Sequence, residues 1–321
     1  MTRIFALLAA AAALVPGTSL AETLYVSNER GDSITVIDAA TMKPVATWPT
    51  GGRPRGIAVS RDGKYLFVCA SNDHAVQVID RATGKVVADL PSGEDPEQFF
   101  PSRDGKLLFV ANEDNAALTA IDVAARTVAF QVDVGKEPEG VAQSPDGRWL
   151  VVTSEDGNLV NWIDLGTRTM VQGMETALRP RHVEFTADGK SLWIAAEVGG
   201  VVQIADVDSR RVTETVRFAP PGVKDYQVLP CGIRFTPDGR TAVVALGRAN
   251  TIALVDVASR KVRAYVPVGK RVWHLAVSGD GTRAYTANGL SDDVSVVDLA
   301  AAKVIATVPA GAGPWGAALA P

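Results

Sequence analysis

Short apolar runs separated by polar turns recur along the chain, and the stretch from Pro54 to Gly93 contains one complete set. Within it, residues 54–59, 65–69, 75–79 and 85–90 are rich in β-branched and aromatic side chains with partial period-two alternation. Gly, Pro, Asn and Asp bound these runs, and no helical spacing persists. Asp62-Gly63 is a hairpin-turn signal, because glycine adopts a positive φ without steric cost. The pattern predicts four antiparallel strands that need neighbouring units to bury both faces.

The same unit returns about every 42 residues. The turn dipeptide Asp-Gly begins at Asp62, Asp104, Asp146, Asp188, Asp238 and Asp280. An aspartate ends the third strand at Asp38, Asp80, Asp122, Asp164, Asp206, Asp256 and Asp298, with one spacing of 50 residues and all others of 42. Four strands in a period near 42 are typical of a propeller blade. We therefore expect an all-β fold, a seven-bladed β-propeller of four-stranded blades.

The two ends of the repeat predict how the ring closes. From Thr23 the chain begins with a second strand, and the missing first strand appears at the C-terminus, where residues 314–319 match residues 54–59. The C-terminal strand should therefore join the N-terminal blade and remove the exposed sheet edges. The long interval carries eight extra residues around Phe218 to Pro230. An insertion on one face of a repeat protein is either a functional elaboration or a tolerated surface loop.

The N-terminal segment departs from the repeat. Arg3 precedes an apolar run from Ile4 to Val15, and Ser19-Leu20-Ala21 provides small residues for cleavage. This arrangement predicts a secretory signal peptide over residues 1–21, the alternative being a retained anchor, and a single propeller domain over residues 22–321. Once the segment is removed, no other apolar stretch is long enough to span a membrane. We expect a periplasmic protein.

Charge and cysteine content narrow the function classes. The formal net charge of −4 becomes −5 when Arg3 is removed, which argues against general nucleic-acid binding. Cys69 and Cys231 are the two cysteines, and the repeat places them four blades apart, so we expect free thiols and no disulfide. The sequence contains no Cys-x-x-Cys-His, so covalent haem attachment is excluded.

Several fragments carry a family resemblance. They are Leu24-Tyr-Val-Ser-Asn28, Phe109-Val-Ala-Asn112 and Tyr285-Thr-Ala-Asn288, together with Ser144-Pro-Asp-Gly147 and Thr236-Pro-Asp-Gly239. They resemble the YVTN family of β-propeller repeats, and the whole chain resembles the PQQ-dependent catabolism-associated β-propeller family. The resemblance implies a periplasmic protein encoded beside quinoprotein alcohol oxidation and an ABC-type export system, without an established reaction. Its partner would be a periplasmic quinoprotein dehydrogenase, a cytochrome or an ABC-transport component.

Candidate binding residues lie where the blades differ from one another. In a propeller, the starts of the inner strands and the ends of the second strands meet at one mouth of the central channel. Two successive positions on the inner strands vary while the scaffold repeats. The ligand- or partner-binding candidates at these positions are Arg55, Glu97, Glu139, Arg181, His182, Cys231, Trp273, His274 and Trp315.

Metal binding has two candidate sets at this mouth. Second-strand ends add Glu29, Glu113, Glu155 and Glu197, and gathered carboxylates either bind a hard divalent cation or form a solvated acidic rim. His182 and His274 fall at equivalent positions two blades apart. A transition-metal site there would need a third ligand, for which Cys231 or Glu197 is available. The alternative is two histidines satisfied by the backbone.

Aromatic and basic residues at the mouth suggest a different ligand. Trp273 and Trp315, with Arg55, Arg181, Lys270 and Arg271 nearby, have the chemistry to stack on and neutralise a planar anion such as PQQ. The alternative is tryptophans that pack between blades. No Gly-x-Ser-x-Gly, phosphate-cradling loop or dinucleotide motif occurs. We therefore favour a non-enzymatic binding or accessory protein, with no catalytic residue assigned, over a metal-dependent, lactonase-like propeller hydrolase or an oxidoreductase.

Overall fold

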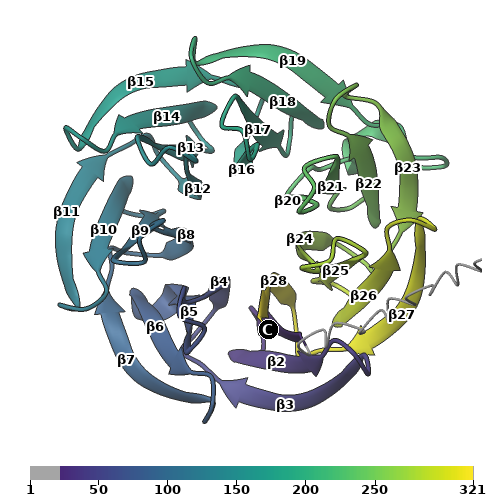
Figure 1. Cartoon of the computed structure of the whole chain (residues 1–321), viewed down its shortest axis with the longest axis horizontal. Helices are drawn as coiled ribbons and strands as arrows, with labels where there is room; N and C mark the ends of the chain where they lie inside the picture. Colours follow the sequence, from purple (N-terminus) through teal and green to yellow (C-terminus); the bar gives the residue numbers. More distant parts are fainter. Residues whose placement is uncertain (1–21, 321) are drawn as a thin grey trace, which may run out of the picture.

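The protein is a ring of seven four-stranded antiparallel sheets (Figure 1), as the sequence repeat predicts. The computed structural model describes residues 22–320, so the predicted signal peptide lies outside the described residues. Within that range no helix has the length and apolar character to cross a bilayer, and the helical elements are two 3-10 turns, η1 (Ser71–Asp73) and η2 (Asp225–Gln227). The fold is therefore all-β.

Each blade runs from an inner strand at the channel to an outer strand at the rim. Blade one contains β28 (Pro314–Ala320), β1 (Thr23–Asn28), β2 (Ser33–Asp38) and β3 (Lys43–Pro49). Blade two contains β4 (Pro54–Val59), β5 (Tyr65–Ala70), β6 (Ala75–Asp80) and β7 (Lys85–Pro91). Blade three contains β8 (Pro96–Pro101), β9 (Leu107–Asn112), β10 (Ala117–Asp122) and β11 (Thr127–Asp133). Blade four contains β12 (Pro138–Gln143), β13 (Trp149–Ser154), β14 (Leu159–Asp164) and β15 (Thr169–Glu175). Blade five contains β16 (Pro180–Phe185), β17 (Ser191–Ala196), β18 (Val201–Asp206) and β19 (Arg211–Arg217). Blade six contains β20 (Ile233–Phe235), β21 (Thr241–Ala245), β22 (Thr251–Asp256) and β23 (Val262–Pro267). Blade seven contains β24 (Val272–Val277), β25 (Arg283–Asn288), β26 (Asp293–Asp298) and β27 (Lys303–Pro309).

The predicted closure is confirmed by the pairing of β28 with β1. Leu319 lies opposite Leu24 and Ala317 opposite Val26 in this antiparallel pair. The last strand of the sequence thus completes the first blade, and the ring has no free inner edge at the junction.

The Asp-Gly turns are confirmed and share one hydrogen-bond pattern. In each, a Ser or Thr hydroxyl two residues earlier donates to the aspartate at 2.5–2.7 Å, for example Thr186 to Asp188 at 2.7 Å. The following glycines have φ between 68° and 79°, the left-handed region in which a side chain is strained. The turns fix the offset between the first two strands of each blade.

An irregularity in the inner strands creates the mouth. Pro54 pairs with Ala70 and Ile57 with Val68, so three residue steps on the inner strand match two on its partner. The same bulge recurs in blades three, four and seven. Bulges re-aim side chains, so the position after the proline leaves the regular in-and-out alternation and projects at the mouth.

The core lies between neighbouring blades. Trp162 packs edge-to-face on Trp149 in its own blade and on Phe185 in the next, with ring centroids 6.0 and 6.1 Å apart. Trp193 packs in the same way against Phe235 at 5.4 Å. Trp149, Trp162, Phe185 and Trp193 are buried, so each blade depends on the next for burial of its apolar face.

Blade six departs from the predicted pattern at its inner strand. β20 begins at Ile233, so Pro230 and Cys231 precede the strand instead of opening it. The Gly232 N–H donates to Trp273 O of blade seven at 3.0 Å instead of to its own blade. The insertion before this strand follows β19, carries η2 and covers the blade with buried Phe218 and Val228.

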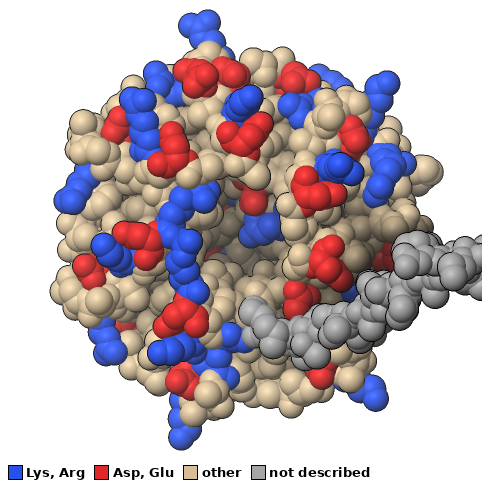
Figure 2. Space-filling view, in the orientation of Figure 1, with Lys and Arg blue, Asp and Glu red and all other residues tan. Residues whose placement is uncertain are grey.

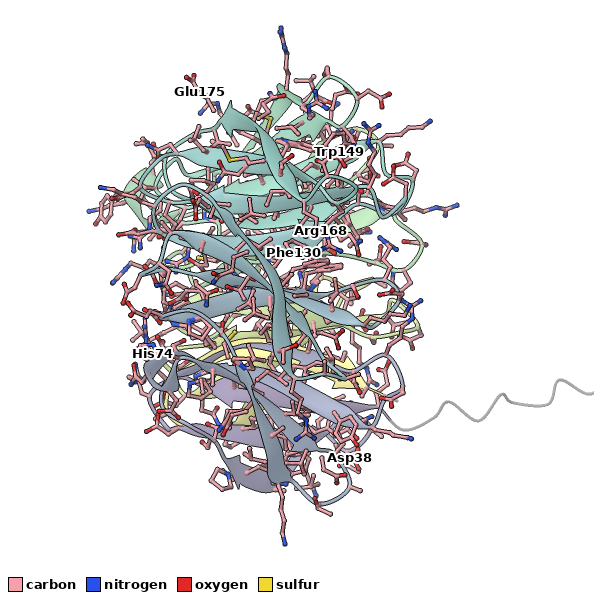
Figure 3. The ribbon with its side chains drawn as sticks, turned by 90° about the vertical axis from the view of Figure 1, so that its left-hand side faces the viewer. Asp38, His74, Phe130, Trp149, Arg168 and Glu175 are labelled. Carbon is pink, nitrogen blue, oxygen red and sulfur yellow. The ribbon has the colours of Figure 1, made fainter. Side chains whose placement is uncertain are left out.

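The ring has two distinct faces. In the edge-on view of Figure 3, His74 and Glu175 lie on the mouth side, and Asp38 and Trp149 lie on the other. Figure 2 views the face opposite the mouth, which is hollowed at its centre and shows basic and acidic side chains inside the hollow. The candidate residues therefore lie around and within one central channel.

Candidate functional site

Two ion-pair clusters occupy the mouth. The blade-three cluster contains Arg53 and Arg55 with four carboxylates, Glu29, Asp95, Glu97 and Glu113. The blade-five cluster contains Arg179, Arg181 and Arg271 with three carboxylates, Glu139, Glu155 and Glu197. Both arise from residues just before and just after the inner-strand proline and from second-strand ends.

The blade-three cluster joins blades one, two and three. The Arg55 guanidinium donates from Nε to Glu29 Oε1 at 2.9 Å and pairs through Nη1 with Glu97 Oε2. Arg53 Nη1 donates to both Asp95 oxygens at 2.8 and 2.7 Å. Arg53 and Asp95 both have left-handed backbone conformations, with φ of 56° and 49°, which place their side chains over the mouth.

The blade-five cluster is centred on Arg181, which contacts three carboxylates. Its Nη2 atom lies 2.6 Å from Glu139 Oε2, its Nε atom lies 3.2 Å from Glu155 Oε1, and its Nη1 atom lies 3.0 Å from Glu197 Oε2. Arg271 Nη2 donates to Glu197 Oε1 at 2.6 Å. Each carboxylate of this cluster therefore faces a guanidinium.

These carboxylates do not form the solvated acidic rim that the sequence allowed. Glu97, Glu139, Glu155 and Glu197 are buried, and each pairs with an arginine guanidinium. Burial and the adjacent Glu139 raise the pKa of Glu155 to about 10. Burial opposes ionisation of Glu139 as well, but Arg181 outweighs it and holds the pKa of Glu139 below its usual range. Glu155 is therefore the member of this pair that retains a proton.

The aromatic candidates are covered by arginines and do not form an open clamp for a planar anion. Trp315 is buried, with the His274 ring 4.3 Å and the Arg55 guanidinium 5.5 Å from its ring centroid. Arg271 and Arg181 lie 3.7 and 5.1 Å from the Trp273 centroid. Trp315 therefore packs between blades, which was the alternative to stacking on a ligand. The expected PQQ contact with these rings would require the arginines to leave their carboxylates, so the residues do not fit that cofactor as they stand.

The two histidines meet in the channel, as their equivalent positions predicted. Their ring centroids are 5.4 Å apart, and Gly232 between them leaves room, since a Cβ there would lie 3.0 Å from His274 Nδ1. Arg234 Nη1 donates to His182 Nε2 at 2.8 Å, so that ring is neutral. Burial lowers the pKa of both histidines. His182 Nδ1 and His274 Nε2 have no hydrogen-bond partner among residues 22–320.

The structure does not supply the third metal ligand proposed for this pair. Cys231 Sγ donates to Leu229 O at 3.1 Å and lies 4.0 Å from Glu197 Oε1. In the described part of the chain, the group of three or more metal-ligating side chains with mutually close ligand atoms is Asp95, Glu97 and Glu113. Cys69 and Cys231 are free and buried, as expected, and burial raises the pKa of the Cys231 thiol to about 12.

One ion pair in the channel was not expected from the sequence. Arg234 Nη1 donates to Glu184 Oε2 at 2.8 Å. Glu184 lies two positions after His182 on β16, and Arg234 lies two positions after Gly232. The sequence contains a signal for this pair, because the positions in other blades that correspond to Glu184 and Arg234 are mainly alanine: Ala58, Ala142, Ala276 and Ala318. Charged residues among alanines mark a departure from the scaffold.

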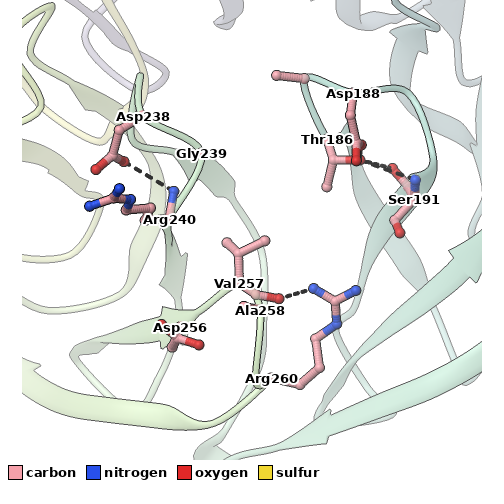
Figure 4. Close-up of a pocket in the computed structure, with 11 residues that line it drawn as sticks. Thr186, Asp188, Ser191, Asp238, Gly239, Arg240, Asp256, Val257, Ala258 and Arg260 are labelled. Carbon is pink, nitrogen blue, oxygen red and sulfur yellow. Dashed lines mark hydrogen bonds between the residues drawn. The ribbon is translucent and has the colours of Figure 1, made fainter.

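A cavity of about 640 Å³ lies away from the mouth, between the turns of blades five and six (Figure 4). Its polar groups are already used within the turns. Asp188 accepts from Thr186 Oγ1 at 2.7 Å, Asp238 accepts from the Arg240 N–H at 3.0 Å, and Arg260 donates to Val257 O. The cavity is therefore a gap between repeated turns and carries no assigned chemistry.

Fold and mouth together define a seven-bladed β-propeller whose channel mouth is held by buried ion pairs. The chain belongs to the YNCE-like β-propeller family, whose family model matches residues 8–101 and 142–316. A second model, the cytochrome D1 heme domain, matches residues 68–177. No curated protein matches the sequence significantly.

Solved structures share the fold at low sequence identity. Hydrazine synthase of Kuenenia stuttgartiensis is 24% identical, with a TM-score of 0.78 over 87% of this chain and 92% of that one. A putative 6-phosphogluconolactonase of Bacteroides uniformis is 15% identical, with a TM-score of 0.78 over 94% and 99%. Dihydro-heme d1 dehydrogenase NirN in complex with DHE is 18% identical, with a TM-score of 0.69 over 92% and 74%. These similarities establish the architecture alone.

Proposed function

We propose that this propeller is an exported, non-catalytic binding protein that works beside quinoprotein alcohol oxidation in the periplasm and binds a protein partner on its mouth face. The resemblance to the PQQ-dependent catabolism-associated family supplies the setting. One structural observation supports binding on this face. It is an exposed apolar surface built by the insertion and the adjoining loops.

This surface, the apolar rim, consists of Leu178, Val198 and Tyr226, whose exposed fractions are 54%, 55% and 73%. Val198 and Tyr226 line one cavity of about 520 Å³ above buried Phe218 and Val228. The Gly199 N–H donates to Leu178 O at 2.9 Å, which places Leu178 beside them. Contiguous exposed apolar side chains on a folded protein commonly mark an interaction site.

The chemistry of the mouth favours binding over catalysis. Its arginines are paired with carboxylates, and the Cys231 thiol remains protonated because burial raises its pKa to about 12. Of the candidate binding residues at the mouth, Arg181 and Trp315 are buried and offer little surface to a partner. A partner would instead contact the apolar rim, with Lys224 beside the Tyr226 ring at 5.8 Å.

The decisive experiment replaces two exposed side chains of the rim. The double variant Val198→Ser, Tyr226→Ser should bind the purified quinoprotein alcohol dehydrogenase, or the c-type cytochrome of the same periplasm, at least about tenfold more weakly than wild type, because an exposed aromatic anchor often carries interface energy. The matched control is Val45→Ser, Val171→Ser on the outer strands, where both valines are also exposed. Kd values from biolayer interferometry give the comparison.

Three results would overturn the proposal. Wild type binds neither probe, the control loses as much affinity as the rim variant, or the purified protein alone turns over a lactone or an alcohol. The last result would favour the lactonase-like hydrolase or oxidoreductase alternative.

A tetrapyrrole ligand is the second candidate, favoured by the cytochrome D1 match over residues 68–177. The channel residues do not fit such a ligand well. The matched range contains neither His182 nor His274, and the throat rings lie only 4.3–5.4 Å apart. The mouth arginines are also already paired with carboxylates. A haem titration followed by absorbance tests this candidate, and a saturable spectral shift that His274→Ala abolishes would support it.

A further inference from the structure

We infer that the mouth binds one hard divalent cation, of the calcium class, between the carboxylates of Asp95, Glu97 and Glu113. This site is independent of the partner proposed above. It includes Asp95, which was not among the residues expected from the sequence, and it leaves out Glu155 and Glu197, whose carboxylates do not belong to this close group of ligand atoms.

The three carboxylates are brought together by blade three alone. Asp95 and Glu97 flank the first residue of β8, and Glu113 follows the last residue of β9. The Glu113 N–H donates to Asp95 O at 3.0 Å, which fixes the two segments against each other. One oxygen of each carboxylate lies within 4.8 Å of the others. Oxygen ligands at about 2.3–2.6 Å from a calcium ion are separated by no more than about 5 Å, so the spacing suits that ion.

A buried oxygen without a donor points to a missing cation. Glu97 is only 1% exposed, and its Oε1 accepts no hydrogen bond from residues 22–320. Arg53 Nη2 lies 3.3 Å from this oxygen but lacks hydrogen-bond geometry. Burying carboxylate oxygens without donors is costly, and a metal ion removes that cost.

The charge balance leads to the same position. The blade-three cluster has four carboxylates for two arginines, whereas the blade-five cluster has three arginines for the carboxylates of Glu139 and Glu197 and the protonated Glu155. One bound divalent cation would balance the two extra negative charges of the blade-three cluster. Arg53 shares Asp95, and its side chain is 30% exposed.

Calcium suits these ligands better than magnesium. Magnesium requires near-ideal octahedral geometry at short distances and retains its waters, whereas calcium accepts irregular sets of carboxylates. Asp95 and Glu113 lie in loops and Glu97 lies in β8, so the three ligands are not related by a regular repeat. We therefore expect calcium to bind more tightly than magnesium by at least about tenfold.

The test is calorimetric titration of CaCl₂ into the full chain purified from its host and stripped with EDTA. We expect one ion per chain and a higher Tm with calcium than with EDTA. Glu113→Gln should weaken calcium binding at least about tenfold, because it removes one charged ligand and remains close in shape. The matched control, Asp114→Asn, removes the same charge from the adjacent exposed position and should leave the affinity within about twofold.

The proposal fails if folded wild type shows no calcium heat up to millimolar concentration, or if Asp114→Asn weakens binding as much as Glu113→Gln. It also fails if MgCl₂ binds equally well. Circular dichroism of each variant confirms folding. Should Glu113→Gln not fold, Asp95→Asn and the wild-type titration decide the result.

Discussion

The two ion-pair clusters at the mouth occupy equivalent backbone positions but balance their charges differently. Arg55 and Arg181 both follow the inner-strand proline, two residues after the equivalent Arg53 and Arg179. Arg181 contacts three carboxylates and Arg55 contacts two. In the blade-five cluster every carboxyl group has a guanidinium partner and Glu155 keeps its proton, whereas the blade-three cluster has two more carboxylates than arginines. The repeat therefore determines where a side chain projects, and the neighbouring blades determine what it does there.

This difference separates a structural cluster from a binding cluster. In a buried group of charges in which every carboxylate has a guanidinium partner, removal of one partner is costly because the others remain buried. A group with more carboxylates than arginines retains affinity for a cation. The comparison predicts that perturbing blade five lowers stability, while perturbing blade three mainly changes ion binding.

The largest effect should come from opening the ring, on which both clusters depend. Truncation after Gly313 removes β28, and with it the Leu24–Leu319 pair and the Trp315 ring beneath Arg55. We expect a loss of at least about 3–5 kcal/mol of unfolding free energy, the cost of deleting one buried Trp. Urea denaturation followed by tryptophan fluorescence measures it. Removal of Pro321 alone is the control, and an unchanged midpoint in the truncated chain would refute closure by β28.

The sequence predicts the positions in this comparison better than the contacts. A 42-residue period identifies each blade and places Arg55, Glu97, Glu139 and Arg181 at one mouth. It does not show that Arg53 pairs with Asp95, because long side chains reach across blades and the bulge redirects them. The same spacing places Arg53, Asp95, Glu137 and Arg179 at equivalent positions, but it does not show which of them pair.

The sequence also did not predict that the glutamates at the mouth are buried. Glutamates at loop ends are usually solvated, and only the close approach of adjacent inner strands, which glycines such as Gly140 permit, covers them. A Cβ at Gly140 would lie 2.6 Å from Arg181 O. The throat histidines were placed correctly because they occupy equivalent positions, but their contact distance depends on Gly232 between them.

The second prediction compares one arginine from each cluster. Arg181→Met should lower the unfolding free energy by about 3–5 kcal/mol, because Glu139 and Glu197 then remain buried without this counter-charge. Arg53→Met should lower it by about 1 kcal/mol or less, because that side chain is partly exposed and its ion pairs are screened. Parallel urea melts measure both. Equal losses in the two variants would remove the distinction between the clusters.

The smallest effect concerns a single proton in the blade-five cluster. Burial and the adjacent Glu139 raise the pKa of Glu155 to about 10, well above its value of about 4.3 in the unfolded chain. Between these values the folded protein binds a proton that the unfolded chain has lost, so this group makes stability fall as the pH rises. Glutamine imitates the protonated form and should remove the decline. Glu155→Gln should therefore gain stability relative to wild type from pH 5 to pH 9, reaching at least about 1.4 kcal/mol, the equivalent of one pKa unit.

Glu139→Gln is the matched control with the opposite sign, because Arg181 holds the pKa of Glu139 low and its charged form stabilises the fold above the unfolded pKa. Thermal melts across that pH range test both variants, and a parallel decline in Glu155→Gln and wild type would show that Glu155 is ionised in the folded protein.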